Sequence, residues 1–482
     1  MSVFDRIGGP RGRFWRSFRR AGIAVSLALA VNVPLAAQAA QPGAGKPDGA
    51  PTGAVTSALP QLEKKKMDIQ EVTSPGGIKA WLVEEHSVPL VAIRFAFHGG
   101  SAQDPADKAG VANFMTAMLD EGAGDLKADA FQERMEDLAT RMSFSEGRDT
   151  FYGSFQSLSE NLNESADLLR LALTKPRFDD DAIERIRKQL LAGLAFAAKN
   201  PNRVAGRLWA ETAFQGHPYG RPSNGTPETI AAVTADDLRA YARDVFARDN
   251  LEVAVVGDIT AAHLGRLLDE VFGALPQKAK LAAVPEASLA AGKVKVAKMP
   301  VPQSVAVFGL PGLKRHDPDF VTAYVMNHIL GGGGFSSKLM EEVREKRGLA
   351  YSVYSYLQPF DHAAILAGQV ATKNDALAKS LEVIRSEIRQ MAEKGPTQQE
   401  LDDAKSYLTG SYPLRFDTNS KIASQLLAIQ LEDLGIDYVN RRNAQIEAVT
   451  LDDVKRVAKR LLDPNRLIVA IAGKPEGVEA TN

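Results

Sequence analysis

Hydrophobic positions along the chain repeat with two periods, one typical of strands and one typical of helices. Apolar and polar residues alternate over residues 91–97 and 304–308, which predicts a strand in each place. Apolar residues recur at helical spacing from Val111 to Met118 and from Leu377 to Ile388. Because strands and helices do not alternate strictly, the pattern favours an α+β fold in which helices cover one face of a mainly antiparallel sheet.

One closing pattern occurs twice in the chain. Residues 232–238 and 448–454 both read Ala-Val-Thr, one variable residue, two aspartates and an apolar residue. A helical pattern and an apolar strand ending in glycine follow each copy, and the copies keep an offset of 216 residues. A constant offset of this kind indicates an internal duplication. We therefore expect two homologous halves, residues 66–276 and 299–482, which face each other as a clamshell.

Three segments lie outside the two halves. Residues 277–298, rich in Lys and Ala with single Pro and Gly residues, form the predicted linker. Residues 1–39 combine a basic stretch, a short apolar run and a small-residue cleavage site, which is typical of a signal peptide rather than of a membrane anchor. Residues 40–65 have the composition of a flexible tether. We expect a periplasmic protein, exported by the Sec or the twin-arginine route.

Composition narrows the range of functions. The 482 residues carry 58 basic and 59 acidic side chains, so there is no basic surplus for binding nucleic acid. The lack of cysteine excludes disulfides, thiolate zinc sites, iron–sulfur clusters and a cysteine nucleophile. Of the seven histidines, no two are closer than twelve residues in sequence, so none forms a helical pair of metal ligands.

Specific motifs lie near the start of the second half. Residues 330–339 read Leu-Gly-Gly-Gly-Gly-Phe-Ser-Ser-Lys-Leu, and residues 342–353 read Glu-Val-Arg-Glu-Lys-Arg-Gly-Leu-Ala-Tyr-Ser-Val. This sequence closely resembles the pitrilysin/insulinase-like metallopeptidases, which include the mitochondrial processing peptidases and their short bacterial relatives. The duplicated halves and the stretch His-Pro-Tyr-Gly at residues 217–220 also match. The resemblance therefore covers nearly all of the mature chain, and it implies that residues 217–220 form a structural turn.

The resemblance also shows what this chain lacks. Active members carry an inverted zinc motif, H-x-x-E-H, on a helix of the first half, with a distant acidic third ligand. The segment that resembles this helix has Asn113, Thr116 and Ala117 at the three motif positions, and the third ligand falls near Gly193. None of these residues can bind zinc or activate a water molecule. We expect no metal or other cofactor in this chain, and zinc in a partner subunit.

A second set of family residues is retained. The resemblance implies that an arginine and a tyrosine seven residues apart face the zinc site and hold the substrate and the oxyanion, and Arg344 and Tyr351 match this pair. Each residue alone has a plainer interpretation, as a solvated helix residue and as a core tyrosine. The processing peptidases use a glycine-rich loop to handle substrate, so Gly331, Gly332, Gly333 and Gly334 are candidate substrate contacts, or else a break between helices.

Two functions remain open at this point. The first is a zinc-lacking subunit of a heterodimeric metallopeptidase, which lends Arg344 and Tyr351 to the zinc site of a homologous H-x-x-E-H partner that degrades or processes peptides. The second is a catalytically silent peptide-binding or scaffold protein of the same fold. A homodimer is not excluded. A hydrolase with another nucleophile has little support, because no G-x-S-x-G motif is present.

Overall fold

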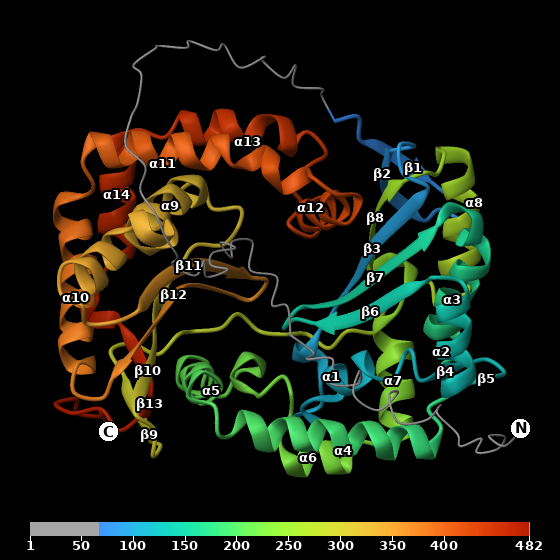
Figure 1. Ribbon diagram of the computed structural model, residues 1–482, viewed down its shortest axis with the longest axis horizontal. Coiled ribbons are helices and arrows are strands. Elements are labelled where there is room, and N and C mark those ends of the chain that lie inside the picture. The colour runs from blue at the N-terminus through green and yellow to red at the C-terminus, as the bar shows by residue number, and fades with distance from the viewer. Residues whose placement is uncertain (1–66, 482) are drawn as a thin grey trace, which may run out of the picture.

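The computed structural model describes residues 67–481, which form two halves that face each other (Figure 1). The predicted signal peptide and tether lie outside the described residues. The first half extends from β1 (Gln70–Thr73) to α8 (Ala261–Phe272), and the second from β9 (Val294–Lys298) to β13 (Ile468–Gly473). Each half combines one sheet with several helices, so the predicted α+β fold class is confirmed.

The first sheet contains six strands, and all neighbouring pairs except one are antiparallel. Its remaining strands are β2 (Lys79–Glu84), β3 (Leu90–His98), β6 (Arg141–Glu146), β7 (Thr150–Leu158) and β8 (Leu251–Gly257). Their order is β1-β2-β8-β3-β7-β6. A separate small ribbon pairs β4 (Gly122–Ala123) with β5 (Leu126–Lys127). The central strand β3 contains the strand predicted at residues 91–97.

The second sheet repeats five strands of the first in the same order. Its other strands are β10 (Gln303–Pro311), β11 (Ser352–Phe360) and β12 (Ala363–Lys373). The order β9-β13-β10-β12-β11 corresponds to β2-β8-β3-β7-β6, and the parallel pair β9–β13 corresponds to β2–β8. The sequence duplication is therefore a duplication of the sheet. Because β9 pairs with β13, the second sheet begins at Val294, inside the segment 277–298 that the sequence predicts as a linker.

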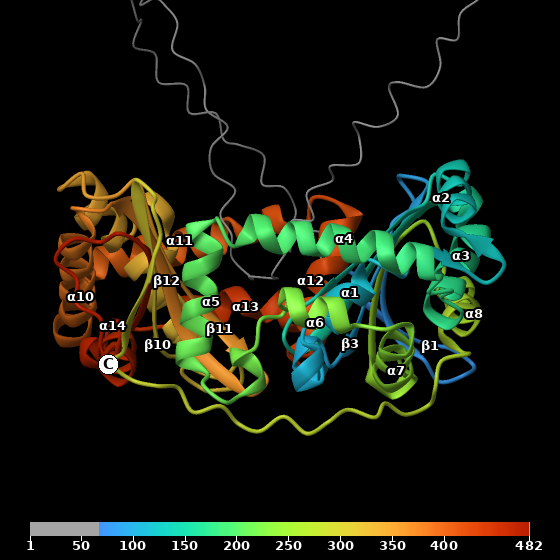
Figure 2. The same ribbon diagram turned by 90° about the horizontal axis from the view of Figure 1, so that it is seen from below.

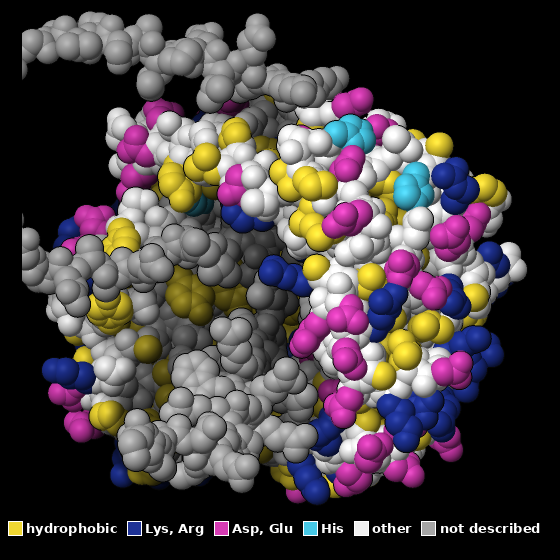
Figure 3. Space-filling view, turned by 45° about the vertical axis from the view of Figure 1, so that its right-hand side comes forward, with side chains coloured by type: hydrophobic (Ala, Val, Ile, Leu, Met, Phe, Trp, Pro, Cys, Tyr) yellow, Lys and Arg dark blue, Asp and Glu magenta, His cyan; other side chains and the backbone are white. Residues whose placement is uncertain are grey.

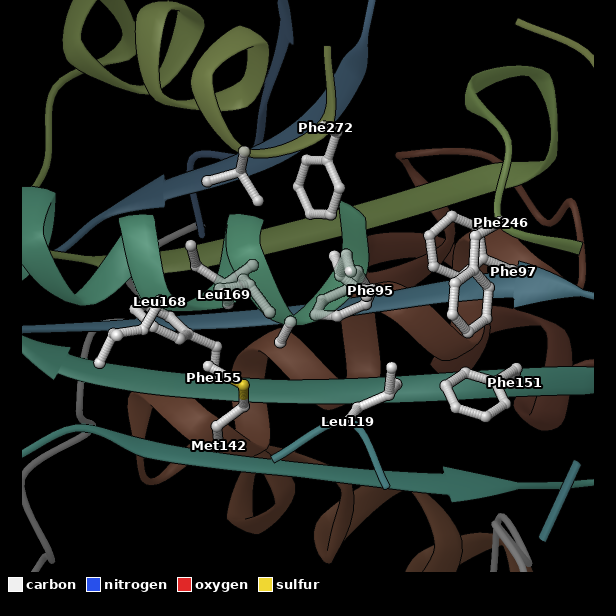
Figure 4. Packing of buried hydrophobic residues seen from close by; sticks show 14 of the residues in the cluster. Phe95, Phe97, Leu119, Met142, Phe151, Phe155, Leu168, Leu169, Phe246 and Phe272 are labelled. Carbon is white, nitrogen blue, oxygen red and sulfur yellow. The ribbon is translucent and has the colours of Figure 1, made fainter. Parts of the chain in front are cut away.

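Helices pack on one face of the first sheet and form a core rich in phenylalanine. These helices are α1 (Val111–Thr116), α2 (Ala128–Asp137), α3 (Leu162–Thr174), α7 (Ala235–Val245) and α8. Figure 4 shows Phe95 and Phe97 of β3 together with Phe151, Phe246 and Phe272 in this core. The ring of Phe95 lies against Gly153 of β7, where a Cβ atom would come within 2.0 Å of it.

The helices of the second half form a separate core on the corresponding face of the second sheet. They are α9 (Phe320–Asn327), α10 (Leu377–Lys394), α11 (Gln398–Gly410), α13 (Tyr438–Glu447) and α14 (Leu451–Leu461). The repeated sequence begins α7 in the first half and α14 in the second. Thr234 and Thr450 form capping boxes with the aspartates three residues later, so both copies serve as helix starts.

The two halves exchange one helix each. α5 (Pro201–Ala213) packs on β10 and β13 of the second sheet, where the indole of Trp209 donates a hydrogen bond of 3.3 Å to the carbonyl of Ile468. α12 (Asn419–Leu431) packs on β3 and β8 of the first sheet. Figure 1 shows both crossings. Each sheet is thus covered by its own helices on one face and by a helix of the other half on the opposite face.

The remaining helices connect these layers. α4 (Asp180–Ala197) runs from the first half toward the second and leads into α5, and α6 (Pro227–Ala232) lies beside it (Figure 2). His217 and Tyr219 form a turn in which the Nδ1 atom of His217 accepts a hydrogen bond of 3.1 Å from the Tyr219 amide. None of the described helices combines the length and the apolarity needed to cross a bilayer.

Candidate functional site

The helix that corresponds to the zinc-binding helix is α1, and it is short. It starts after Gly110, and the buried carboxylate of Asp104 accepts hydrogen bonds from the amides of Gly110 and Ala112, at 2.7 and 2.9 Å. The sequence predicts helical spacing as far as Met118, but α1 ends at Thr116. The last motif position, Ala117, is therefore the capping residue that follows the helix.

Residues without metal-binding groups occupy the motif positions. Asn113 donates a hydrogen bond of 3.3 Å from Nδ2 to Oε1 of Glu146 on β6. The hydroxyl of Thr116 donates to the carbonyl oxygen of Asn113, at 2.7 Å. Burial raises the pKa of Glu146 above its ordinary value. The space beside α1 therefore holds a neutral amide paired with a carboxyl group, rather than imidazole ligands.

The position of the expected third ligand, Gly193, is exposed to solvent. Gly193 lies on an exposed part of α4, and a Cβ atom added there would meet nothing within 4 Å. Within residues 67–481, no group of three or more histidine, cysteine, aspartate or glutamate side chains is arranged to hold a metal ion. The zinc site implied by the resemblance does not fit Asn113, Thr116, Ala117 and Gly193, so no chemical step through a metal is derived for this chain.

The structure brings Arg344 and Tyr351 together. The guanidinium carbon of Arg344 lies 5.0 Å from the centre of the Tyr351 ring and 4.7 Å from the centre of the Phe335 ring. We call these three side chains the Phe335–Arg344–Tyr351 stack. The tyrosine is 81% exposed and the phenylalanine 61%. Cation–π contacts with two aromatic rings stabilise the position of a guanidinium while its N–H groups stay available.

The backbone between Arg344 and Tyr351 explains their proximity. A π-helical turn (Met340–Glu345) carries Arg344, and Gly348 ends it with a φ of +58°. The amide of Gly348 donates to the carbonyl of Arg344 at 2.8 Å, and the amide of Leu349 donates to the carbonyl of Val343 at 2.9 Å. Such a closure by a glycine with positive φ reverses the chain and leads directly to β11. Tyr351 precedes the first residue of that strand.

The glycine run at residues 331–334 has a role in packing and in chain direction. Gly331 and Gly332 belong to a π-helical turn (His328–Gly332) packed on β11, and a Cβ atom on Gly331 would lie 2.4 Å from the hydroxyl oxygen of Ser355. Gly334 has a φ of +60° and begins the short 3₁₀ helix (Gly334–Ser336) that carries Phe335. The run therefore allows close packing and places Phe335 in the stack. Contact with a substrate remains a prediction.

Two aromatic neighbours of this region were not identified from the sequence. His328 stacks on Tyr407 of α11, with ring centres 5.1 Å apart. Burial lowers the pKa of His328 to about 4. Neither residue has a motif signal, because a histidine before a glycine run and a tyrosine on an amphipathic helix both occur in ordinary cores. Their pairing depends on the tertiary contact between the π-helical turn and α11.

The two sets of predicted site residues belong to different halves. α1 lies in the first half and β11 in the second (Figure 1). Among the described residues, no hydrogen bond, ion pair or ring contact links Arg344 or Tyr351 to Asn113, Thr116 or Ala117. The face seen in Figure 3 is hollowed between the halves, and hydrophobic side chains are visible in the hollow. The retained pair is therefore not assembled with the degenerate motif positions.

Comparison with protein families gives two adjoining matches. Residues 80–227 match the family model described as insulinase (peptidase family M16). Residues 232–408 match the model described as peptidase M16 inactive domain. The degenerate motif positions lie within the first match, and the Phe335–Arg344–Tyr351 stack lies within the second.

Individual relatives cover most of the chain. A protein from Helicobacter pylori named non-peptidase homolog YmxG is 30% identical over 80% of this chain and 90% of its own length. A Streptomyces coelicolor protein named uncharacterized zinc protease SCO5738 is 28% identical over 82% of this chain and 87% of its own length.

Solved structures with a similar fold also cover most of the chain. The peptidase M16 inactive domain from Pseudomonas fluorescens is 30% identical and superimposes with a TM-score of 0.80, covering 86% of this chain and 100% of that one. A chain of complex III2 from Candida albicans, at 16% identity and a TM-score of 0.70, covers 86% of this chain and 98% of its own; it shares the fold.

Proposed function

Because this chain belongs to peptidase family M16 and its zinc-motif positions carry no metal ligand, we propose that it is the zinc-lacking subunit of a heterodimeric metallopeptidase. Its membership confirms the family resemblance carried by residues 330–353. The partner is a homologous H-x-x-E-H subunit that binds the zinc ion. The observation that carries the proposal is the Phe335–Arg344–Tyr351 stack, in which two exposed aromatic rings contact the guanidinium although α1 has no metal ligands.

The retained pair has the chemistry that peptide cleavage needs at the carbonyl group. A peptide carbonyl that is attacked develops a negative charge on its oxygen, and preorganised donors stabilise that charge. The phenol of Tyr351 can donate one hydrogen bond, and the guanidinium of Arg344 can donate several. The closest carboxylate oxygen to Arg344, Oε1 of Glu345, lies 3.6 Å from its Nε atom, so the guanidinium has no short ion pair that competes with a substrate.

The sheet edges indicate where a peptide can bind as an added strand. β11 is an edge strand, but Asn327 donates a hydrogen bond of 3.1 Å to the Ser355 carbonyl and occupies that edge. β6 is the corresponding edge of the first sheet, and its last residue, Glu146, contacts α1. An extended peptide bound to β6 gains main-chain hydrogen bonds. We propose this edge as the peptide-binding strand of the chain.

Reconstitution tests the proposal directly. The full chain is co-expressed with the H-x-x-E-H relative from the same source, and the purified mixture is analysed for stoichiometry, zinc content and cleavage of an unfolded quenched peptide. We expect an equimolar complex with about one zinc per pair and activity at least tenfold above either chain alone. A partner in which the motif glutamate is replaced by glutamine serves as the control. Separate elution of the chains, or no gain in activity, would refute the proposal.

A second candidate is a catalytically silent peptide-binding or scaffold protein. It is favoured by the 30% identical relative from Helicobacter pylori, which is named non-peptidase homolog YmxG. In that case no H-x-x-E-H relative gains activity from this chain, although an unfolded peptide still binds to it. The reconstitution separates the two functions, because only the first requires the mixed complex to cleave.

We further propose that the protein acts in the periplasm after removal of residues 1–39 as a signal peptide. The basic stretch, short apolar run and small-residue cleavage site support this. Sequencing the N-terminus of the protein from the periplasmic fraction tests it, and the expected first residue is Ala40. Recovery of the protein in the cytoplasm with an intact N-terminus would contradict the proposal.

A further inference from the structure

A cavity of about 120 Å³ lies in the second half, away from the Phe335–Arg344–Tyr351 stack. Its walls come from α9, β11, α12, α13 and the 3₁₀ helix Tyr412–Phe416. A second cavity of about 220 Å³ adjoins it, and Arg315 and Tyr438 line both. α12 is the helix that crosses to the first sheet (Figure 1). Since Ala428 and Ile429 of α12 line the smaller cavity, this cavity lies beside the connection between the halves.

The walls of the smaller cavity are aromatic and aliphatic. Its apolar lining residues include Phe320, Val321, Leu357, Ile429, Leu434 and Ile446. Tyr412 is buried, and the guanidinium carbon of Arg442 lies 4.1 Å from the centre of its ring. An apolar cavity of about 150 Å³ holds a benzene molecule in another protein. The present cavity is somewhat smaller, but together with the adjoining cavity of about 220 Å³ it has room for one aromatic ring or one branched aliphatic group.

The charges around this cavity are unequal. Three arginines, Arg315, Arg415 and Arg442, line it, and Glu432 is its single acidic lining residue. Among the described residues, no carboxylate forms an ion pair within 4 Å with Arg315 or Arg442. Arg442 is only 6% exposed. Its guanidinium donates hydrogen bonds to the carbonyl of Leu408 and to Oδ1 of Asn443, at 3.2 and 3.0 Å. Arg315 is partly buried and has no carboxylate in an ion pair with it, so it favours an anionic ligand, because the ligand compensates its desolvation.

Arg315 has donors available for such a ligand. Its Nη2 atom donates a hydrogen bond of 2.9 Å to the hydroxyl of Tyr438. Its guanidinium carbon lies 4.5 Å from the ring centre of Phe320 and 5.4 Å from that of Tyr438, so the two rings fix its position. A guanidinium carries five N–H donors, and one is engaged in the hydrogen bond to Tyr438. The remaining donors can form a bidentate pair with a carboxylate.

Glu432 supplies a second polar contact. It follows the last residue of α12, its side chain is half-buried, and no hydrogen bond to its carboxyl group is formed by the residues that the structure describes. A carboxyl group in such surroundings can donate a hydrogen bond to an anion when it is protonated. Burial raises the pKa of Glu432 to about 7, so the protonated form, which adds to the recognition of a carboxylate, becomes more populated as the pH falls below 7.

We propose that this cavity binds an amphipathic carboxylate, with its aromatic or branched aliphatic group among Phe320, Leu357 and Ile446 and its carboxylate on Arg315. The ligand is either a small free acid or the C-terminal residue of a peptide, since both present the same chemistry. The site does not depend on a zinc-bearing partner, so it holds for either candidate function of the chain.

Calorimetric titration of the purified full chain tests the site. The probes are phenylacetate and its neutral isostere phenylacetamide, followed by N-acetyl-Gly-Phe with a free C-terminus and the same peptide as the amide. We expect phenylacetate to bind at one site per chain, at least tenfold more tightly than the amide. If the free-acid peptide binds more tightly than phenylacetate, the natural ligand is a peptide terminus; if it does not bind, the ligand is a small acid.

Variants check the location of the site. Arg315→Gln is expected to weaken phenylacetate binding at least tenfold, and Ala428→Phe, which fills the cavity from α12, is expected to abolish binding. Arg389→Gln, at a position that does not line either cavity, is the matched control and retains wild-type affinity. Equal binding of acid and amide, no saturable binding of any probe, or unchanged affinity in both cavity variants would overturn the proposal. The acid–amide comparison needs no variant and holds even if a variant fails to fold.

Discussion

Tyr219 donates a hydrogen bond of 2.5 Å to Oδ1 of Asp149, and both of these first-half side chains contact the second half. The turn between β11 and β12 completes the junction. The amide of His362 donates to the Tyr219 hydroxyl at 3.0 Å, and the amide of Asp361 donates to Oδ2 of Asp149 at 3.2 Å. The stretch His-Pro-Tyr-Gly is thus an anchor for the tip of the second sheet.

Loss of the Tyr219 hydroxyl is expected to destabilise this junction. In Tyr219→Phe, the Asp149 carboxyl and the His362 amide both lose a partner, and a buried polar group left without one costs about 1–3 kcal/mol. The free energy of unfolding, measured by urea titration, should fall by about that amount. Tyr356→Phe on β11 is the control, and no hydrogen bond of its hydroxyl is formed within the described residues. Equal stability of the two variants would contradict the anchoring role.

A glycine on β10 controls how α5 packs on the second sheet. A Cβ atom at Gly309 would lie 2.5 Å from the Trp209 ring, so Gly309→Ala forces the indole away from its hydrogen bond with Ile468. Overpacking of this kind costs about 1–3 kcal/mol. We expect a lower melting temperature. We also expect the tryptophan emission of the folded protein to shift to longer wavelength, because the Trp209 indole becomes more exposed to solvent.

Gly206 provides the matched control, because it lies on α5, the helix that carries Trp209. A Cβ atom there would meet nothing within 4 Å, and replacing glycine by alanine in a helix interior stabilises it by about 0.5–1 kcal/mol. Gly206→Ala should therefore raise the melting temperature while Gly309→Ala lowers it. A shift of the same sign in both variants would show that the contact with Trp209 does not limit the docking of α5.

The sequence predicts the two sheets and their duplication, because strand alternation and the repeated pattern at residues 232–238 and 448–454 are local signals. It does not predict the exchange of α5 and α12. Amphipathic periodicity shows that a helix has an apolar face, but not which sheet that face contacts. The contact of Trp209 with the second sheet therefore appears only in the tertiary structure.

The candidate site is likewise only partly predictable from the sequence. The spacing of Arg344 and Tyr351 is visible in the sequence through the family resemblance, and the turn at Gly348 agrees with it. The third member of the stack, Phe335, is nine residues before Arg344 and carries no signal of its own. Its position depends on two π-helical turns, whose hydrogen-bond pattern is set by packing against β11 rather than by residue preference.

Removing the Tyr351 hydroxyl is expected to abolish most of the activity of the mixed complex. Tyr351→Phe keeps the ring in the stack and removes one oxyanion donor, and loss of such a donor costs about 10²–10³-fold in kcat. Tyr354→Phe is the matched control, because Tyr354 is 42% exposed on the adjacent strand but lies outside the stack. Peptide cleavage and complex formation should be measured on the same samples. Full turnover by Tyr351→Phe would exclude a catalytic role for this phenol.

The stack itself predicts that arginine cannot be replaced by lysine. Arg344→Lys keeps the positive charge, but an ammonium group lacks the planar surface that contacts Phe335 and Tyr351 and cannot donate in a bidentate manner. We expect cleavage by the mixed complex to fall by about 10-fold or more, with KM and kcat both affected. Arg347→Lys, whose partner Glu342 lies outside the stack, should have little effect.

His328 predicts how stability depends on pH. Burial lowers its pKa to about 4 in the folded protein, whereas an unfolded chain has the ordinary value of about 6.5. Between these values the unfolded state binds the proton and the folded state does not. The contribution of neutral His328 to the free energy of unfolding is therefore fully present above pH 6.5 and is lost as the pH falls toward 4. Each unit of difference corresponds to about 1.4 kcal/mol. In His328→Phe, the decrease in the free energy of unfolding between pH 7 and pH 4, measured by urea titration, should be smaller than in the wild type by at least about 1 kcal/mol. Tyr407→Phe keeps a ring against His328 and should retain the wild-type slope. If His328→Phe loses stability on acidification as steeply as the wild type, other groups cause the dependence.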